Sequence, residues 1–175
     1  VERTYAVPPF AGVGYSTSDV YRVSAGGPGL LVVEAEDQWV KVSIFNTVTG
    51  TVLASTSQRQ GGGGYDPTGR YYYHGDDNSS GSVMHKLDTA GDVFAQTAQS
   101  SVSGVSYYGS RTVVMSEDGK RVFWNGVAFD QNLTPEWSVG DIIYSASADG
   151  RYAFSQTKIY DVAQKKSLLA MPVST

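Results

Sequence analysis

The chain has 175 residues, of which 17% are charged, and a formal net charge of −4. This length fits one compact domain, and a hydrophobic fraction of 41% with twelve tyrosines excludes an intrinsically disordered chain. No apolar run is long enough for a membrane helix, and Lys and Arg form no basic stripe. We therefore expect neither membrane insertion nor nucleic-acid binding.

The absence of cysteine excludes several kinds of covalent and metal site. Disulfides, thiolate nucleophiles, iron–sulfur clusters and zinc–thiolate sites all need cysteine, and the chain has none. The lack of cysteine does not fix the compartment, because exported bacterial proteins and cytosolic proteins can both do without it. Because the first residue is Val1, we expect either a mature chain that has lost a signal segment or a part cut from a longer protein.

Short apolar runs predict β-strands along most of the chain. The runs are rich in β-branched or aromatic residues and are bounded by Gly, Asn or Asp, which favour turns. Helical periodicity is nearly absent, so the predicted fold is all-β. Gly61 to Gly64 are interpreted as a flexible connection. In chain order the predicted strands cover residues 29–34, 41–45, 51–54, 70–73, 92–95, 111–115, 121–124, 142–144 and 151–154.

A repeated pattern organises these strands. Its first half is a polar turn followed by a strand, and the turn contains Asp118-Gly119 in one repeat and Asp149-Gly150 in another. Glycine supplies the positive φ of a tight hairpin, while the aspartate binds nearby backbone N–H groups. Asn125-Gly126 is the strongest two-residue hairpin signal in the chain. The second half is a strand that ends in a bulky residue followed by Asn or Asp, at Asn46, Asp88, Asp130 and Asp161.

The repeat predicts four units within a single domain that covers residues 1–175. The marks recur at intervals of about forty residues, with a shorter last interval, which leaves room for four strands in each unit. The expected units are residues 20–58, 59–100, 101–138 and 139–175.

These units resemble the bacterial YVTN/WD-like β-propeller repeats, in which a D-G-[KR]-aromatic strand precedes a strand ending in aromatic-D and then T-G. The resemblance covers about Gly26 to Met171 and departs from the pattern where Gly26-Gly-Pro-Gly29 replaces the D-G turn. It implies a β-propeller-like fold of about four blades of four antiparallel strands, as either a small closed disc or an arc of a larger propeller. Residues 3–7 are the candidate for an extra strand that closes the ring.

The most polar loop is predicted between His74 and Ser82. Carboxylate and amide oxygens there are of the kind that calcium binds, although their spacing differs from a calcium-binding loop. We interpret the segment as a solvated hairpin tip, with a Ca²⁺ site and a ligand contact as alternatives. No other cofactor is expected, and the nature of any metal is left open. The candidate ligand-binding residues are Tyr72, His74, Asp76, Asp77 and Asn78.

Catalytic signals are weak, and no catalytic residue is assigned. His74 beside Asp76 and Asp77 could act as a general base, and Glu34 is among the carboxylates that could pair. No hydrolase motif or phosphate-binding loop is present in the sequence. His85 alternates with apolar neighbours and is interpreted as a hydrogen-bonded histidine within a sheet. Most tyrosines are interpreted as packing between sheets, with a sugar- or peptide-binding face as the alternative.

Together these observations favour a non-catalytic binding or scaffold module that recognises a protein or carbohydrate partner through rim loops. The alternative is a propeller enzyme of hydrolase or lactonase type with a carboxylate or metal site, so enzymatic activity stays open. We expect an exported bacterial protein in an extracellular, periplasmic or cell-surface setting, and leave a cytoplasmic one open. Self-association and membership of a larger propeller are the expected modes of assembly.

Overall fold

The computed structural model describes residues 21–26, 28–35, 41–59, 61–78, 81–102 and 112–170. These residues form sixteen strands and no helix, which confirms the all-β prediction. The described ranges accordingly hold no helix of the length and apolarity needed to cross a membrane. The predicted closing strand at residues 3–7 lies outside the described residues.

The strands form four antiparallel sheets, and in each sheet four strands are paired in chain order. The first sheet contains β1 (Tyr21–Ala25), β2 (Leu30–Ala35), β3 (Lys41–Asn46) and β4 (Thr51–Arg59). The second contains β5 (Gly61–Tyr65), β6 (Tyr71–Asn78), β7 (Gly81–Asp88) and β8 (Ala95–Val102). The third contains β9 (Val114–Met115), β10 (Arg121–Trp124), β11 (Val127–Asp130) and β12 (Pro135–Ser138). The fourth contains β13 (Ser145–Ala146), β14 (Tyr152–Phe154), β15 (Lys158–Asp161) and β16 (Lys166–Ala170).

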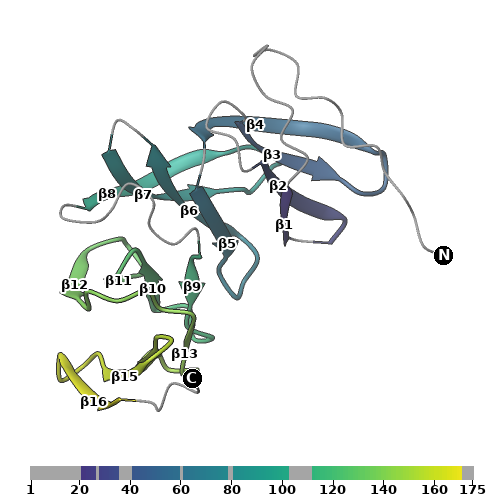
Figure 1. Cartoon of the computed structure of the whole chain (residues 1–175). Coiled ribbons are helices and arrows are strands. Elements are labelled where there is room, and N and C mark those ends of the chain that lie inside the picture. The colour runs from purple at the N-terminus through teal and green to yellow at the C-terminus, as the bar shows by residue number, and fades with distance from the viewer. Residues whose placement is uncertain are drawn as a thin grey trace.

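The four sheets follow one another in a curved row (Figure 1). The first strands β1, β5, β9 and β13 lie on the inner side of the curve, and each contacts the first strand of the next sheet. The fourth strands lie on the outer side. Each sheet therefore stands edge-on to the centre of the curve and presents one face to the sheet before it and one to the sheet after it.

Turns of matching geometry gather on one face of the row. Because consecutive strands are antiparallel, the turn from first to second strand and the turn from third to fourth strand point to the same side. We call this side the turn face. The predicted Asp-Gly turns are confirmed there, because φ is +70° at Gly119 and +65° at Gly150. The backbone N–H groups of Lys120 and Arg151 donate to the preceding aspartates at 3.1 and 3.0 Å.

The opposite side of the row carries the turns between second and third strands. Asn125 and Gly126 there have φ of +51° and +72°, and Trp124 pairs with Val127 across them. Both central residues of a type I′ turn need positive φ, so the predicted Asn-Gly hairpin is confirmed.

The described residues form three apolar core clusters, one between each pair of neighbouring sheets. Side chains alternate across a strand, so Tyr72 packs toward the first sheet and Tyr73 toward the third. In the same way Val122 packs backward along the row while Phe123 packs forward. The internal sheets thus bury both faces, which explains strands such as Arg121–Trp124 with three consecutive buried residues.

Some predictions about local structure are wrong. The strand predicted at residues 92–95 is one of them, because β8 begins only at Ala95. Gly61 to Gly64 form strand β5 and pair with β6, so they are not a flexible connection. Glycine suits this strand because neighbours approach its backbone closely: the Tyr72 side chain takes the space of a Cβ atom at Gly63, and the Gly75 carbonyl takes it at Gly61. The strand predicted at residues 142–144 begins later, at Ser145, although the Tyr144 N–H already donates to the Phe154 carbonyl at 2.9 Å.

Candidate functional site

A buried polar cluster joins the first and second sheets. Glu34 on β2 receives a hydrogen bond from the Tyr72 hydroxyl on β6 at 2.6 Å, and the His74 Nδ1 atom lies 2.8 Å from the same Oε1 atom. Tyr72, His74 and Glu34 are only 0%, 1% and 4% exposed. When ionised, the Glu34 carboxylate can only accept, so a hydrogen bond to it requires a proton on the His74 Nδ1 atom. We call these three residues the Glu34 cluster.

The Glu34 cluster links the first and second sheets through hydrogen bonds that are shielded from solvent. Burial, followed by the charge of Glu34, holds the pKa of the Tyr72 hydroxyl well above its ordinary value. The His74 Nε2 atom is also buried and has no hydrogen-bond partner within the described part of the chain. The cluster is therefore built to hold two sheets together by directional bonds rather than to meet a substrate in solvent.

His85 is a second buried histidine beside the Glu34 cluster, within the second sheet. It stands directly across from His74 on the neighbouring strand, and its Nδ1 atom lies 2.9 Å from the Gln96 Oε1 atom. Burial lowers the pKa of His85, which favours the neutral ring. The interpretation of His85 as a hydrogen-bonded histidine within a sheet is thus confirmed.

The structure places the predicted ligand-binding residues on β6 rather than in a loop. Residues 74–78 pair with residues 81–85 of β7 in continuous register, so the predicted loop from His74 to Ser82 is wrong for these residues. Residues 79 and 80 lie outside the described residues. The polar composition favoured a turn, but backbone pairing extends the hairpin because β7 continues the ladder to Gly81. His74 meets Glu34 of another sheet rather than a neighbouring aspartate.

The outer part of the predicted site consists of Asp76, Asp77 and Asn78 at the end of β6. Asp76 is partly exposed and pairs through its backbone with Gly61 and Val83. The structure describes the backbone of Asp77 and Asn78 but not their side chains. No group of three or more His, Asp or Glu side chains in the described ranges is arranged to hold a metal ion. The calcium hypothesis and ligand contact at this hairpin stay predictions.

A polar groove of about 480 Å³ opens on the turn face between the third and fourth sheets. Hydrogen bonds between the turns hold its walls together. The Asp118 N–H donates to the Ala148 carbonyl at 2.9 Å. The Arg121 guanidinium donates to the Gly150 carbonyl at 3.2 Å and to the Glu136 carboxylate at 2.7 Å. We call it the turn-face groove. It is lined by Asp118, Lys120, Arg121, Asp130, Gln131, Asn132, Glu136 and Asp149.

Hydrogen bonds hold three aspartates of the turn-face groove in place and lower the pKa of two of them. The Ser116 hydroxyl and then the Lys120 backbone N–H lower the pKa of Asp118 to about 2, and the Ser147 hydroxyl lowers the pKa of Asp149. Asp130 accepts two backbone N–H bonds at 2.8 Å. Sequence reasoning identified these aspartates as turn residues, but not that turns of two sheets enclose a groove.

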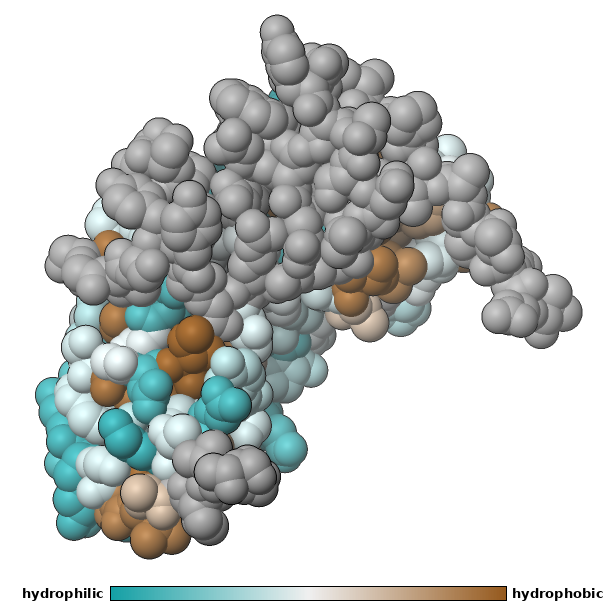
Figure 2. Space-filling model, viewed as in Figure 1, coloured by the Kyte–Doolittle hydropathy of each residue, from teal (hydrophilic) through white to brown (hydrophobic). Residues whose placement is uncertain are grey.

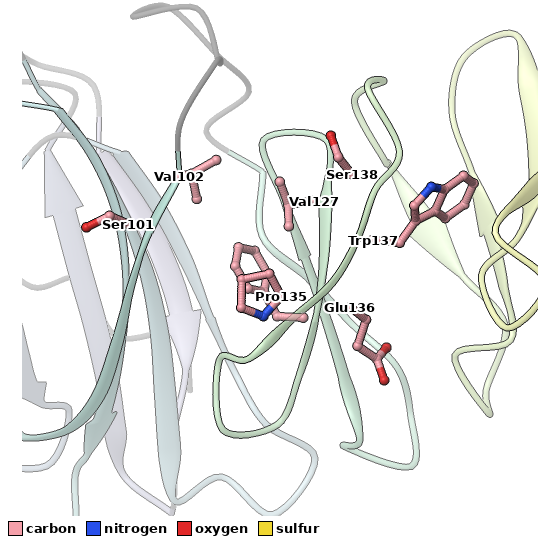
Figure 3. A pocket seen from close by; sticks show the side chains of 8 residues that line it. Ser101, Val102, Val127, Pro135, Glu136, Trp137 and Ser138 are labelled. Carbon is pink, nitrogen blue, oxygen red and sulfur yellow. The ribbon is translucent and has the colours of Figure 1, made fainter.

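A second groove, of about 340 Å³, lies between the second and third sheets on the outer side of the row (Figure 3). Val102 of β8 and Val127 and Pro135 of the third sheet line it, with Ser101 and Ser138 at its edges. The ring of Trp137 points away from it, toward the fourth sheet, where it packs edge-on against Tyr160 at 5.8 Å. The apolar lining here therefore belongs largely to packing between sheets.

Comparison with known proteins gives no family for this chain. Neither a family model nor a curated protein matches its sequence.

Proposed function

We propose that the four sheets are blades of a β-propeller-like scaffold, and that the chain is a non-catalytic module that binds a protein partner at the turn-face groove. The curved row, with first strands on its inner side and matching turns on one face, supports the propeller-like arrangement. The groove walls formed by turns support binding, because loops on a rigid β-scaffold carry recognition while strands carry stability.

The charge of the groove is the observation that favours a protein partner over a carbohydrate. Four carboxylates line it, against two cations, Lys120 and Arg121. Arg121 is already bonded to Glu136, and the Lys120 ammonium lies 3.1 Å from Asp118. The groove keeps an excess of negative charge, which attracts a Lys- or Arg-bearing segment. A sugar-binding groove would instead offer an exposed aromatic ring, and the described residues that line this groove include no aromatic one.

The burial of both histidines supports the non-catalytic reading. The chain contains only His74 and His85, and their side chains are 1% and 7% exposed. A general base must come within hydrogen-bond reach of the proton that it removes from a substrate. The enzyme alternative would therefore need a carboxylate or metal at another place. The exported or surface setting also remains part of this proposal.

The test is an NMR titration of the isotope-labelled chain. The probe is a basic hexapeptide, Gly-Arg-Gly-Lys-Gly-Arg, and its counterpart has Glu at each charged position. We expect shifts confined to the turns around Asp118, Asp130 and Asp149, and none with the acidic peptide. The double change Asp130→Asn with Asp149→Asn should weaken binding about tenfold or more, by loss of two charges.

The matched control is Asp92→Asn, which removes one exposed turn carboxylate outside the groove. It should leave the affinity for the basic peptide within about twofold, apart from a small long-range charge effect. Equal weakening by Asp92→Asn would show attraction to net charge alone and would overturn the assignment of the groove. Shifts in the groove with a neutral oligosaccharide such as chitotetraose, and none with the basic peptide, would make the partner a carbohydrate.

A further inference from the structure

The fourth sheet carries a row of side chains whose counterparts in the other three sheets are covered. In each sheet one residue per strand lies in register on the face toward the next sheet, which we call the forward face. The rows are Ser24–Val32–Ile44–Ala54, Gly64–Tyr73–Lys86–Ala98, Val114–Phe123–Ala128–Trp137 and Ser145–Phe154–Ile159–Leu169.

Burial separates the last row from the first three. The second-strand residues Val32, Tyr73 and Phe123 are at most 1% exposed, whereas Phe154 at the same position is only partly buried. At the outer end of the row, Leu169 is 58% exposed. Figure 2 shows apolar side chains gathered at the lower end of the molecule, where β16 lies in Figure 1.

The three covered rows show what kind of surface the fourth row fits. Each is covered by the sheet that follows, which offers a bulky apolar residue from its third strand: Leu87, Phe129 or Tyr160. The third row is the best match for the fourth, because Phe123 and Phe154 occupy the same position and a large side chain, Trp137 or Leu169, ends each row. Trp137 packs edge-on against Tyr160 of the sheet that covers it.

We propose that the forward face of the fourth sheet binds a further four-stranded antiparallel sheet of the same repeat, as a fifth member of the row. Continuity with three interfaces of one design carries this assignment. A second copy of the chain, docked head to tail, would have to offer the backward face of its first sheet. That face offers no exposed apolar surface at its centre, because Val33 and Phe45 on it are only 4% and 3% exposed.

The test adds such a sheet to the whole chain. A second copy of residues 139–170 is placed directly after Ala170, so that the natural connection 139–144 leads into it and its Tyr160 faces Phe154 and Leu169. The original unit is distinguished by segmental ¹⁵N labelling, because its peptides otherwise have the same masses as those of the added copy. Hydrogen exchange read by mass spectrometry should slow about tenfold or more over β14, β15 and β16 of the original unit, because docking suppresses local opening. Unchanged exchange there overturns the proposal, whether or not the added copy folds.

Two variants separate docking from a general effect of the extension. Tyr160→Asp in the added copy, or Leu169→Lys in the original unit, should abolish the slowing, since each puts a charge into the new interface. Leu169→Lys in the unextended chain should shift Tm by no more than about 2 °C, as an exposed change does. If the unextended chain instead dimerises in sedimentation equilibrium and Leu169→Lys abolishes the dimer, the occupant is a second copy and the proposal is wrong.

Discussion

Strand β6 borders two interfaces that each contain an apolar cluster. Only the interface toward the first sheet, which we call the polar face, also contains a buried carboxylate, and we call the other the apolar face. Tyr72 and Tyr73 are adjacent and equally buried, at 0% and 1% exposure, yet one face meets Glu34 and the other meets an apolar cluster around Trp124. Apolar contact stabilises in proportion to buried area and tolerates small shifts, whereas hydrogen bonds fix a register because they are directional. The comparison teaches that one strand of an internal sheet can supply apolar adhesion on both faces and add directional alignment on only one of them.

The largest expected effect comes from the apolar face. Trp124 is 1% exposed, and its indole lies against Gly75 of β6 in the space that a side chain would take. Trp124→Ala should lower the free energy of unfolding by about 4–5 kcal/mol through lost contacts and the cavity left behind. Urea denaturation checks this value. A loss near 1 kcal/mol would mean that the apolar face is not the main source of adhesion.

Removing Glu34, the shared hydrogen-bond acceptor of the polar face, should lower the free energy of unfolding by a somewhat smaller amount. Glu34→Ala leaves the Tyr72 hydroxyl and His74 Nδ1 without their buried partner, and we expect a loss of about 3 kcal/mol. Glu34→Gln keeps an acceptor oxygen and should lose clearly less. If both variants lose the same amount in urea denaturation, the charge of Glu34 and not its hydrogen bonding holds the interface.

Alkaline pH should weaken both faces together. Burial raises the pKa of Tyr72 and of Tyr73, while an unfolded tyrosine ionises near pH ~10. Above that pH the unfolded chain releases protons that the folded chain keeps, so the free energy of unfolding falls as pH rises. Two such groups give a loss of roughly 2–3 kcal/mol at one pH unit above the unfolded pKa. Their tyrosinate absorbance should therefore appear together with the loss of the β-sheet circular dichroism signal.

The smallest effect is the most direct comparison of the two faces. Tyr73 donates its hydroxyl hydrogen to the Gln131 carbonyl at 2.8 Å, and Tyr72 donates to Glu34. Tyr73→Phe should lose about 0.5–1 kcal/mol and Tyr72→Phe about 1–2 kcal/mol, because a bond to a charged acceptor is the stronger one. The reverse order in thermal melts would place the stronger polar bond on the face that we describe as apolar.

Much of the local structure followed from the residues themselves. Asp118-Gly119, Asp149-Gly150 and Asn125-Gly126 predicted turns with positive φ, and the turns form there because glycine or asparagine can adopt that conformation and aspartate binds the neighbouring N–H groups. Apolar runs bounded by such turns predicted strands, and four sheets of four strands resulted. These features depend on contacts within a few residues, which a sequence contains in full.

Contacts between sheets could not be derived in this way. Glu34 and His74 are forty residues apart in the chain, and nothing in either neighbourhood indicates that they meet. The composition of residues 74–82 favoured a loop, and that of Gly61 to Gly64 a flexible connection, but pairing with adjacent strands made both into hairpin strands. Turns and strand periodicity were thus determined by the sequence itself, through local backbone preference. The polar interface, the turn-face groove and the uncovered forward face were decided only by tertiary structure, because register and packing depend on which sheet lies opposite.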